Sequence, residues 1–269
     1  MSFLFWLFLI GILIALFQDL KRTEVDYWLC LLFFFSGGAY IVFDSLSSGN
    51  LSRIFQLCVF TLIIGALSLI MYYSRIFAGG DSNLLFAMTP VFIAESFSES
   101  FLNVFWFVFI LLFAGAVYGF CYSLYLFLKN QRNVSSAFSN EIKKRQVLLI
   151  LVLGFLSCLF FFVDLIFLLL GAFLIFMAVL YAFAKSIDSA VMINKVNAGD
   201  LQEGDWLLKD VMVGGKIVVT GWGGLSKKDI QLLRKHNRKV RIRKGFAFVP
   251  AFLIAFLIYS FVENFFLIF

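Results

Sequence analysis

The sequence predicts an all-α polytopic membrane protein of about eight transmembrane helices, with a small α+β cytoplasmic domain before the last helix. Three observations lead to this fold class. Of the 269 residues, 62% are hydrophobic and 14% are charged, which is too apolar for a soluble core of this size. Apolar runs recur near the length of about 20 residues that spans a bilayer. Charged residues gather in one late stretch, from Asp188 to Lys244.

The first half of the chain contains five apolar runs, which we expect to be spans. They are Phe3 to Leu20, Tyr27 to Leu46, Ile54 to Tyr73, Asn83 to Phe97 and Phe101 to Leu128. The first run has neither a basic start nor a small-residue cleavage site, so it is expected to be retained and not removed as a signal peptide. The fourth run is short and contains Pro90, which predicts a tilted, broken or partly re-entrant segment.

The second half adds three spans and fixes the orientation. The run from Val147 to Lys185 is too long for one helix and carries Asp164 at its middle, so we expect two spans that turn there. The run from Phe246 to Ile268 is the last. If the N-terminus lies outside the cell membrane, 21 of the 22 basic residues fall in inner loops and only Arg53 falls outside. The positive-inside rule favours this orientation.

The stretch from Asp188 to Lys244 is predicted to form a basic soluble domain. It holds 12 basic and 6 acidic residues. Short strands are expected on either side of Gly214-Gly215, then a helix capped by Ser226, then a strand at VRIR. We divide the chain into a transmembrane core (1–187), this domain (188–244) and a C-terminal transmembrane helix (245–269). The charge is compatible with contact to the lipid bilayer and equally with a solvated face.

Cysteine and histidine predict no metal or cofactor site. The four cysteines occur singly in apolar segments, without a CxxC pair. The one histidine, His236, lies in a basic stretch. We therefore expect no cofactor, no metal and no histidine-based catalytic triad, and we expect no nucleic-acid partner.

Asp19 and Asp81 are the candidate functional residues. Asp19 closes the first span and Asp81 lies between the third and fourth, so the topology brings both to the cytoplasmic boundary. Ionisable groups in a membrane cost about 2.5–3.5 kcal/mol on insertion scales and tend to mark function. Two carboxylates within reach can share one proton and act together as acid and base. Because Asp19 ends its helix, where the dipole disfavours an anion, we expect Asp19 to hold the proton.

Gly79 and Gly80 precede the second aspartate. Residues without a β-carbon permit positive φ and close backbone approach, which an extended substrate segment beside the two carboxylates would require. The alternative is that the sequence from Gly79 to Ser82 only ends one helix and caps the next.

At these positions the chain resembles archaeal prepilin or preflagellin peptidases, which are GxGD-type intramembrane aspartyl proteases. DLKRTEVD, residues 19–26, is similar to the family's D-x-K-x-R-x-V-x stretch, and AGGD, residues 78–81, to its GxGD motif. Arg22 stands one place early, and Ala78 replaces the first glycine. The resemblance implies a catalytic pair, Asp19 and Asp81, and residues that shape the loop or bind substrate: Gly79, Gly80, Lys21, Glu24 and Asp26.

The entry to the final span extends this resemblance. KGFAFVPAFLIAFL is similar to the family's G-I-P-F-V-P-A-F, with Phe246 and Ala247 in place of I-P. The paired-CxxC domain of bacterial relatives is missing, so their N-methyltransferase activity is not implied. The resemblance implies removal of a short basic leader from type IV pilin-like or archaellin precursors, just before their hydrophobic helix. A transporter or channel that binds cations or protons at Asp19 and Asp81, and a non-enzymatic pilus assembly component, remain alternatives.

Overall fold

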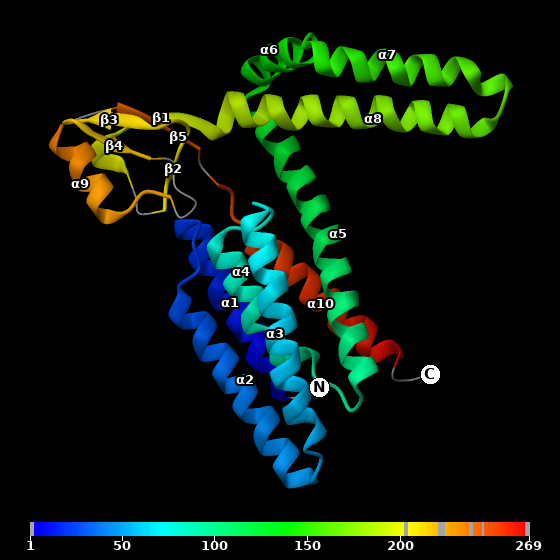
Figure 1. The fold of residues 1–269 in the computed structure, drawn as a ribbon, viewed down its shortest axis with the longest axis vertical. Helices are drawn as coiled ribbons and strands as arrows, with labels where there is room; N and C mark the ends of the chain where they lie inside the picture. Colours follow the sequence, from blue (N-terminus) through cyan, green and yellow to red (C-terminus); the bar gives the residue numbers. More distant parts are fainter. Residues whose placement is uncertain (1–2, 202–203, 220–223, 237–238, 244, 267–269) are drawn as a thin grey trace. The chain divides into compact units, whose positions relative to one another are not determined.

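The computed structural model describes residues 3–201, 204–219, 224–236, 239–243 and 245–266, and this part of the chain is mostly helical (Figure 1). The chain divides into two compact units. Residues 1–119 and 246–269 form the helical unit, and residues 120–245 form the sheet-bearing unit. These boundaries differ from those expected from the charge pattern. The second unit contains the apolar helices at residues 145–159 and 165–187 in addition to the basic stretch.

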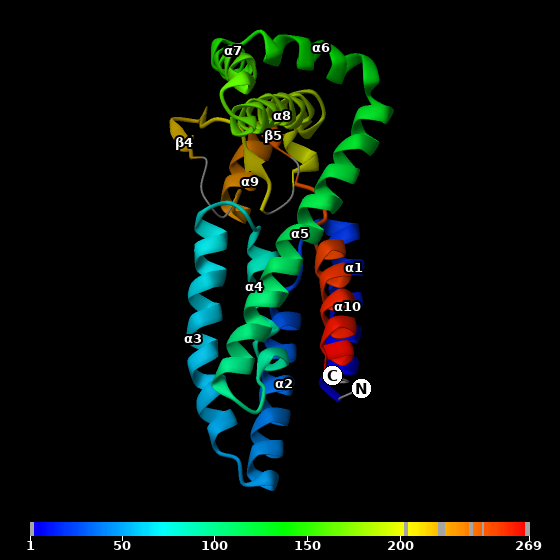
Figure 2. The ribbon, with the colours of Figure 1, turned by 90° about the vertical axis from the view of Figure 1, so that its right-hand side faces the viewer.

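The described residues of the helical unit form seven helical elements, the longest of which, α5, runs past residue 119. They are α1 (Phe3–Arg22), α2 (Tyr27–Ser48), α3 (Ser52–Tyr73), α4 (Gly79–Ala87), the 3-10 helix η1 (Thr89–Phe92), α5 (Phe97–Lys129) and α10 (Val249–Phe266). Figures 1 and 2 show α10 beside α1, and α4 lies against both α2 and α3. The first and last helices of the chain therefore meet, which positions the candidate site.

The fourth apolar run is broken, as Pro90 predicted. Helix α4 ends at Ala87, and the proline lies in η1. The segment nevertheless follows the length of α3. A β-carbon on Gly79 would lie 3.8 Å from Tyr72 near the end of α3, whereas Glu95 lies 3.7 Å from Arg53 near its start, measured from Oε1 to Nη1. Because most of the segment is buried among its neighbours, its broken backbone is covered by protein.

Six helices of the described chain are long and apolar enough to cross a membrane. They are α1, α2, α3, α5, the stretch Arg145–Phe162 and the stretch Leu165–Met192. The prediction of a multi-pass membrane protein therefore agrees with the structure. The predicted turn at Asp164 is confirmed, because Asp164 ends the break and caps the next helix, with its Oδ1 accepting the Ile166 N–H at 2.9 Å.

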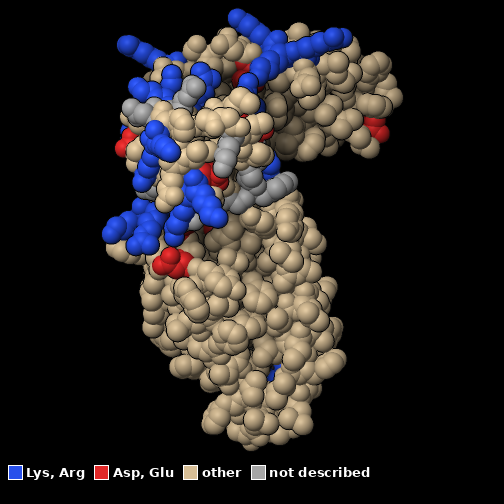
Figure 3. Space-filling model, turned by 60° about the vertical axis from the view of Figure 1, so that its left-hand side comes forward, with Lys and Arg blue, Asp and Glu red and all other residues tan. Residues whose placement is uncertain are grey.

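The sheet-bearing unit combines apolar helices with a small α+β region. Its helices are α6 (Gln131–Ile142), α7 (Arg145–Leu159), η2 (Phe160–Phe162), α8 (Leu165–Ile187), the π-helical turn η3 (Asp188–Met192), η4 (Ala198–Asp200) and α9 (Lys227–Lys235). Its strands are β1 (Ile193–Asn197), β2 (Trp206–Leu207), β3 (Val211–Val213), β4 (Lys216–Val218) and β5 (Lys239–Arg243). Lysine and arginine gather over this unit on the face drawn in Figure 3.

The strands form two antiparallel sheets. One has the order β1-β5-β2, with Lys195 opposite Arg241, and the other is the β3–β4 hairpin. Gly214 and Gly215 have φ of 57° and 78°, which confirms the predicted turn and suits its two-residue hairpin loop. The predicted cap of α9 is also confirmed, because Ser226 Oγ accepts the Asp229 N–H at 3.3 Å. The predicted strand KIVVT ends at Thr220, which lies outside the described residues.

Two glycines allow α7 and α8 to cross closely. A β-carbon on Gly171 would lie 2.5 Å from the carbonyl oxygen of Gly154, and one on Gly154 would lie 3.0 Å from the carbonyl oxygen of Gly171. Since both obstacles are backbone atoms, neither can turn aside as a side chain could. Small residues at such crossings are typical of helices that pack in membranes.

Gly171→Ala is therefore expected to lower the free energy of unfolding by about 1–3 kcal/mol, the usual cost of overpacking. Thermal unfolding of the reconstituted protein measures this change. Gly119→Ala is the matched control, because Gly119 is also a helical glycine and a β-carbon there would meet nothing within 4 Å. Equal melting temperatures for the two variants would contradict the close crossing.

Candidate active site

Asp19 is buried, and its side chain reaches the beginning of α10. The residue lies in the last turn of α1 and is 4% exposed. The backbone N–H of Val249, the first residue of α10, donates to Asp19 Oδ2 at 2.8 Å. A helix N-terminus presents N–H groups without intrahelical partners and the positive end of the helix dipole. Asp19 therefore ends one helix and caps another.

Asp81 is buried at the beginning of α4. It is the third residue of that helix and is 7% exposed. Its Oδ2 accepts the Ala78 N–H at 3.2 Å, so the expected capping role is present. The two carboxylates are close enough to interact electrostatically.

The contact with α10 bears on the predicted distribution of the proton. The end of α1 was expected to make Asp19 the protonated partner, but the beginning of α10 faces that carboxylate and favours its charged form. The local sequence could not indicate this contact, because the donating N–H group lies 230 residues away.

The two glycines have different surroundings. Neither adopts a positive φ, so that part of the prediction is wrong. A β-carbon on Gly80 would lie 3.0 Å from the backbone nitrogen of Val25, so the close approach is made by the chain's own α1–α2 loop. Gly79 has room for a side chain. Ala78 has an ordinary extended backbone, with φ of −72°, so nothing there requires the glycine of the family motif.

The loop from Lys21 to Asp26 borders the site. Lys21, Glu24 and Asp26 are exposed. Asp26 is fixed by a reciprocal pair of hydrogen bonds with Gln18: Gln18 Nε2 donates to Asp26 Oδ2 at 3.1 Å, and the Asp26 N–H donates to Gln18 Oε1 at 3.0 Å. Gln18 was not predicted as a site residue, and no motif in the sequence marks it.

The two carboxylates carry the chemistry that can be inferred for this site. Among the described residues, no group of three or more His, Cys, Asp or Glu side chains is arranged to hold a metal ion. Two carboxylates in different surroundings can supply both a general acid and a general base.

Comparisons of the chain with protein-family models, with curated proteins and with solved structures found no match. The function is therefore inferred from the residues of the site and their geometry.

Proposed function

We propose that the protein is an intramembrane aspartic endopeptidase that cleaves the short basic leader from type IV pilin-like or archaellin precursors. The observation that carries this proposal is the pair Asp19 and Asp81, two buried carboxylates from separate helices that interact electrically. The resemblance of both surrounding motifs to archaeal prepilin and preflagellin peptidases supports the choice of substrate.

The pair can hydrolyse an amide without a covalent intermediate. Asp19, as the ionised base, takes a proton from a water molecule while the water oxygen attacks the scissile carbonyl carbon. Asp81, as the acid, donates its proton to the carbonyl oxygen. Collapse of the tetrahedral intermediate breaks the C–N bond. The proton now on Asp19 passes to the leaving amine, and one hydroxyl of the intermediate returns a proton to Asp81 as the product carboxyl group forms. The contact of Asp19 with the beginning of α10 supports its role as the base.

We further propose eight crossings of the cell membrane, with the N-terminus outside and the pair at the cytoplasmic face. The six long apolar helices, α10 and the broken segment 79–96 make up the eight. The broken segment consists of α4, η1 and four extended residues, and the rise per residue of these parts gives it a length of about 35 Å. The hydrocarbon core of a bilayer is about 30 Å thick, so the segment is long enough to cross it. The distribution of basic residues supports the orientation.

A cleavage assay tests this function. The protein is co-expressed with an archaellin or prepilin precursor, and the proposal predicts a faster-migrating product that begins immediately before the hydrophobic helix. Ion-dependent flux through vesicles, with a precursor of unchanged size, would instead favour a transporter. An unchanged precursor and no flux would leave an assembly component as the better explanation.

A further inference from the structure

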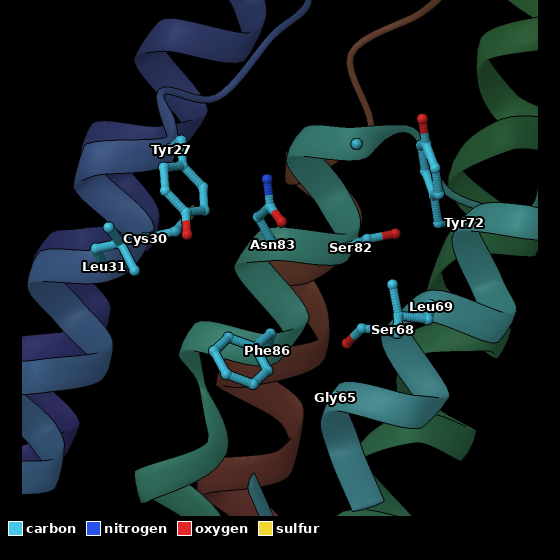
Figure 4. Close-up of a pocket in the computed structure, with 11 residues that line it drawn as sticks. Tyr27, Cys30, Leu31, Gly65, Ser68, Leu69, Tyr72, Ser82, Asn83 and Phe86 are labelled. Carbon is cyan, nitrogen blue, oxygen red and sulfur yellow. The ribbon is translucent and has the colours of Figure 1, made fainter. Parts of the chain in front are cut away.

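A groove runs between α2 and α3, with one face of α4 as its floor (Figure 4). Its volume is about 490 Å³. The floor consists of Gly79, Ser82, Asn83 and Phe86, whose spacing of three and four residues places them on one side of the helix. Asp81 does not line the groove, and its helical position directs it to the opposite side of α4. The groove is therefore separate from the two carboxylates but shares a helix with them.

Two buried hydroxyl groups in this groove have no hydrogen-bond partner among the residues that the structure describes. Ser68 of α3 and Ser82 of α4 are 5% and 6% exposed, and neither Oγ is bonded. Figure 4 shows both side chains directed into the space between α3 and α4. Serine in a helix can bond to the preceding turn, as Ser74 Oγ does to the Ile70 carbonyl at 2.6 Å. The unpaired hydroxyls indicate a ligand that supplies hydrogen-bond acceptors, because leaving them unmet costs free energy.

The chemistry of the groove fits a polypeptide better than a lipid chain. An acyl chain could cover the apolar walls, but it has no acceptor for the hydroxyls. A helical segment covers the same walls, and its carbonyl oxygens keep a second lone pair after their intrahelical bond. Gly65 and Gly79, which also line the groove, allow a backbone to come close.

The groove also lies near the candidate active site along the chain. Gly79 lines the groove and begins α4, and Asp81 follows two residues later. The two sides of a helix are about 10 Å apart, so roughly three extended residues of a substrate would be enough to pass from one side of α4 to the other. Asp26 precedes Tyr27, which lines the groove, and its carboxylate could attract a basic leader. Arg22 partly neutralises this charge, because its Nη1 lies 4.0 Å from Asp26 Oδ1. A segment held in the groove could thus pass over the beginning of α4 to the carboxylates.

We propose that this groove binds the hydrophobic segment of the precursor, with the Ser68 and Ser82 hydroxyls donating to its backbone carbonyls. The proposal rests on the proposed function and adds the place where the substrate docks. A bound segment would leave the scissile bond, a few residues before it, on the Asp19 and Asp81 side of α4.

Site-specific photocross-linking tests the docking site. A photoreactive residue replaces Leu69, which lines the groove, in the Asp19→Asn protein, and membranes that also contain an archaellin precursor are irradiated. We expect a cross-link to the hydrophobic segment of the precursor. Ile70 is the matched control, since it follows Leu69 on the same helix, is 61% exposed and does not line the groove. Cross-linking at Ile70 should be at least several-fold weaker.

The wild-type cleavage assay separates this proposal from the proposed function. Cleavage without preferential cross-linking at Leu69, or cross-linking of Leu69 to lipid alone, would overturn the groove but not the peptidase. Preferential cross-linking without cleavage would support the groove and overturn the peptidase. Absence of both would overturn both.

A kinetic comparison tests the two hydroxyls. Ser68→Ala combined with Ser82→Ala should raise KM about fivefold to tenfold, the effect of one to two modest hydrogen bonds, while kcat stays within about twofold. Ser74→Ala is the control, because the Ser74 hydroxyl already bonds within its own helix and lies outside the groove lining. An unchanged KM in the double variant would remove the hydroxyls from substrate binding.

Discussion

Asp19→Asn and Asp81→Asn should each reduce the rate of precursor cleavage by about 10²–10⁴-fold, the contribution typical of a general acid or base. Each amide keeps the shape of the side chain but can neither take a proton from water nor share one with its partner. The loss should appear in kcat and in kcat/KM alike, because the carboxylates act on the reacting atoms. Combining the two changes should add little, since the pair works as a unit.

Cleavage of an archaellin precursor by each reconstituted variant, followed over time on gels, measures this loss. Asp164→Asn is the matched control, because Asp164 caps α8 and asparagine caps helices as well as aspartate does. Its activity should equal that of the wild type. Retention of more than about a tenth of the activity by either Asp19→Asn or Asp81→Asn would show that the site does not work by general acid and base catalysis.

Gly80→Ala should lower cleavage by a factor of about three to ten, because the neighbouring loop has to give by a few tenths of an ångström and a displacement of about 1 Å in an active site can cost about 10²-fold. The new β-carbon would lie 3.0 Å from the Val25 nitrogen and 3.3 Å from the Val25 Cβ. Val25 is buried, so the α1–α2 loop has to move as a whole. Because this loop begins a few residues after Asp19 and packs against the turn that carries Asp81, its movement would separate the carboxylates.

Gly38→Ala provides the comparison for this prediction, because Gly38 lies in α2 outside the groove lining and its β-carbon would meet only Leu57, at an ordinary distance of 3.8 Å. Initial rates of cleavage for the two variants, with melting temperatures to confirm folding, make the comparison. Gly38→Ala should stay within about twofold of the wild type, the range of weak contacts. Equal losses in the two variants would mean that the contact with Val25 does not set the geometry of the site.

Much of the fold could be predicted from the sequence, because its signals are local. The apolar runs predicted the long helices, Asp164 predicted a turn, and Pro90 predicted the break after α4. The Ser226 cap and the Gly214-Gly215 turn have short signatures of their own. β1 was not predicted, because INKVN carries only two apolar residues and becomes a strand by pairing with β5.

The candidate site was predictable only in its main residues. Asp19 and Asp81 stand out because carboxylates are rare in apolar surroundings. The groups that set their environment are far away in the chain: Val249 donates to Asp19 across 230 residues, and Val25 packs against Gly80. Such contacts depend on which helices become neighbours, which a local pattern does not contain. The contact that favours a charged Asp19 could not be foreseen for the same reason.

Cysteine cross-linking tests most directly whether the two carboxylates meet. Asp19→Cys and Asp81→Cys are introduced together after removal of the four native free cysteines, and a short bifunctional thiol reagent is applied to the protein in membranes. Gln18→Cys with Asp26→Cys is the positive control, since the native side chains are hydrogen-bonded. We predict that mass spectrometry finds residues 19 and 81 joined as efficiently as the control pair. A joined control without any link between 19 and 81 would contradict an aspartate pair at this site.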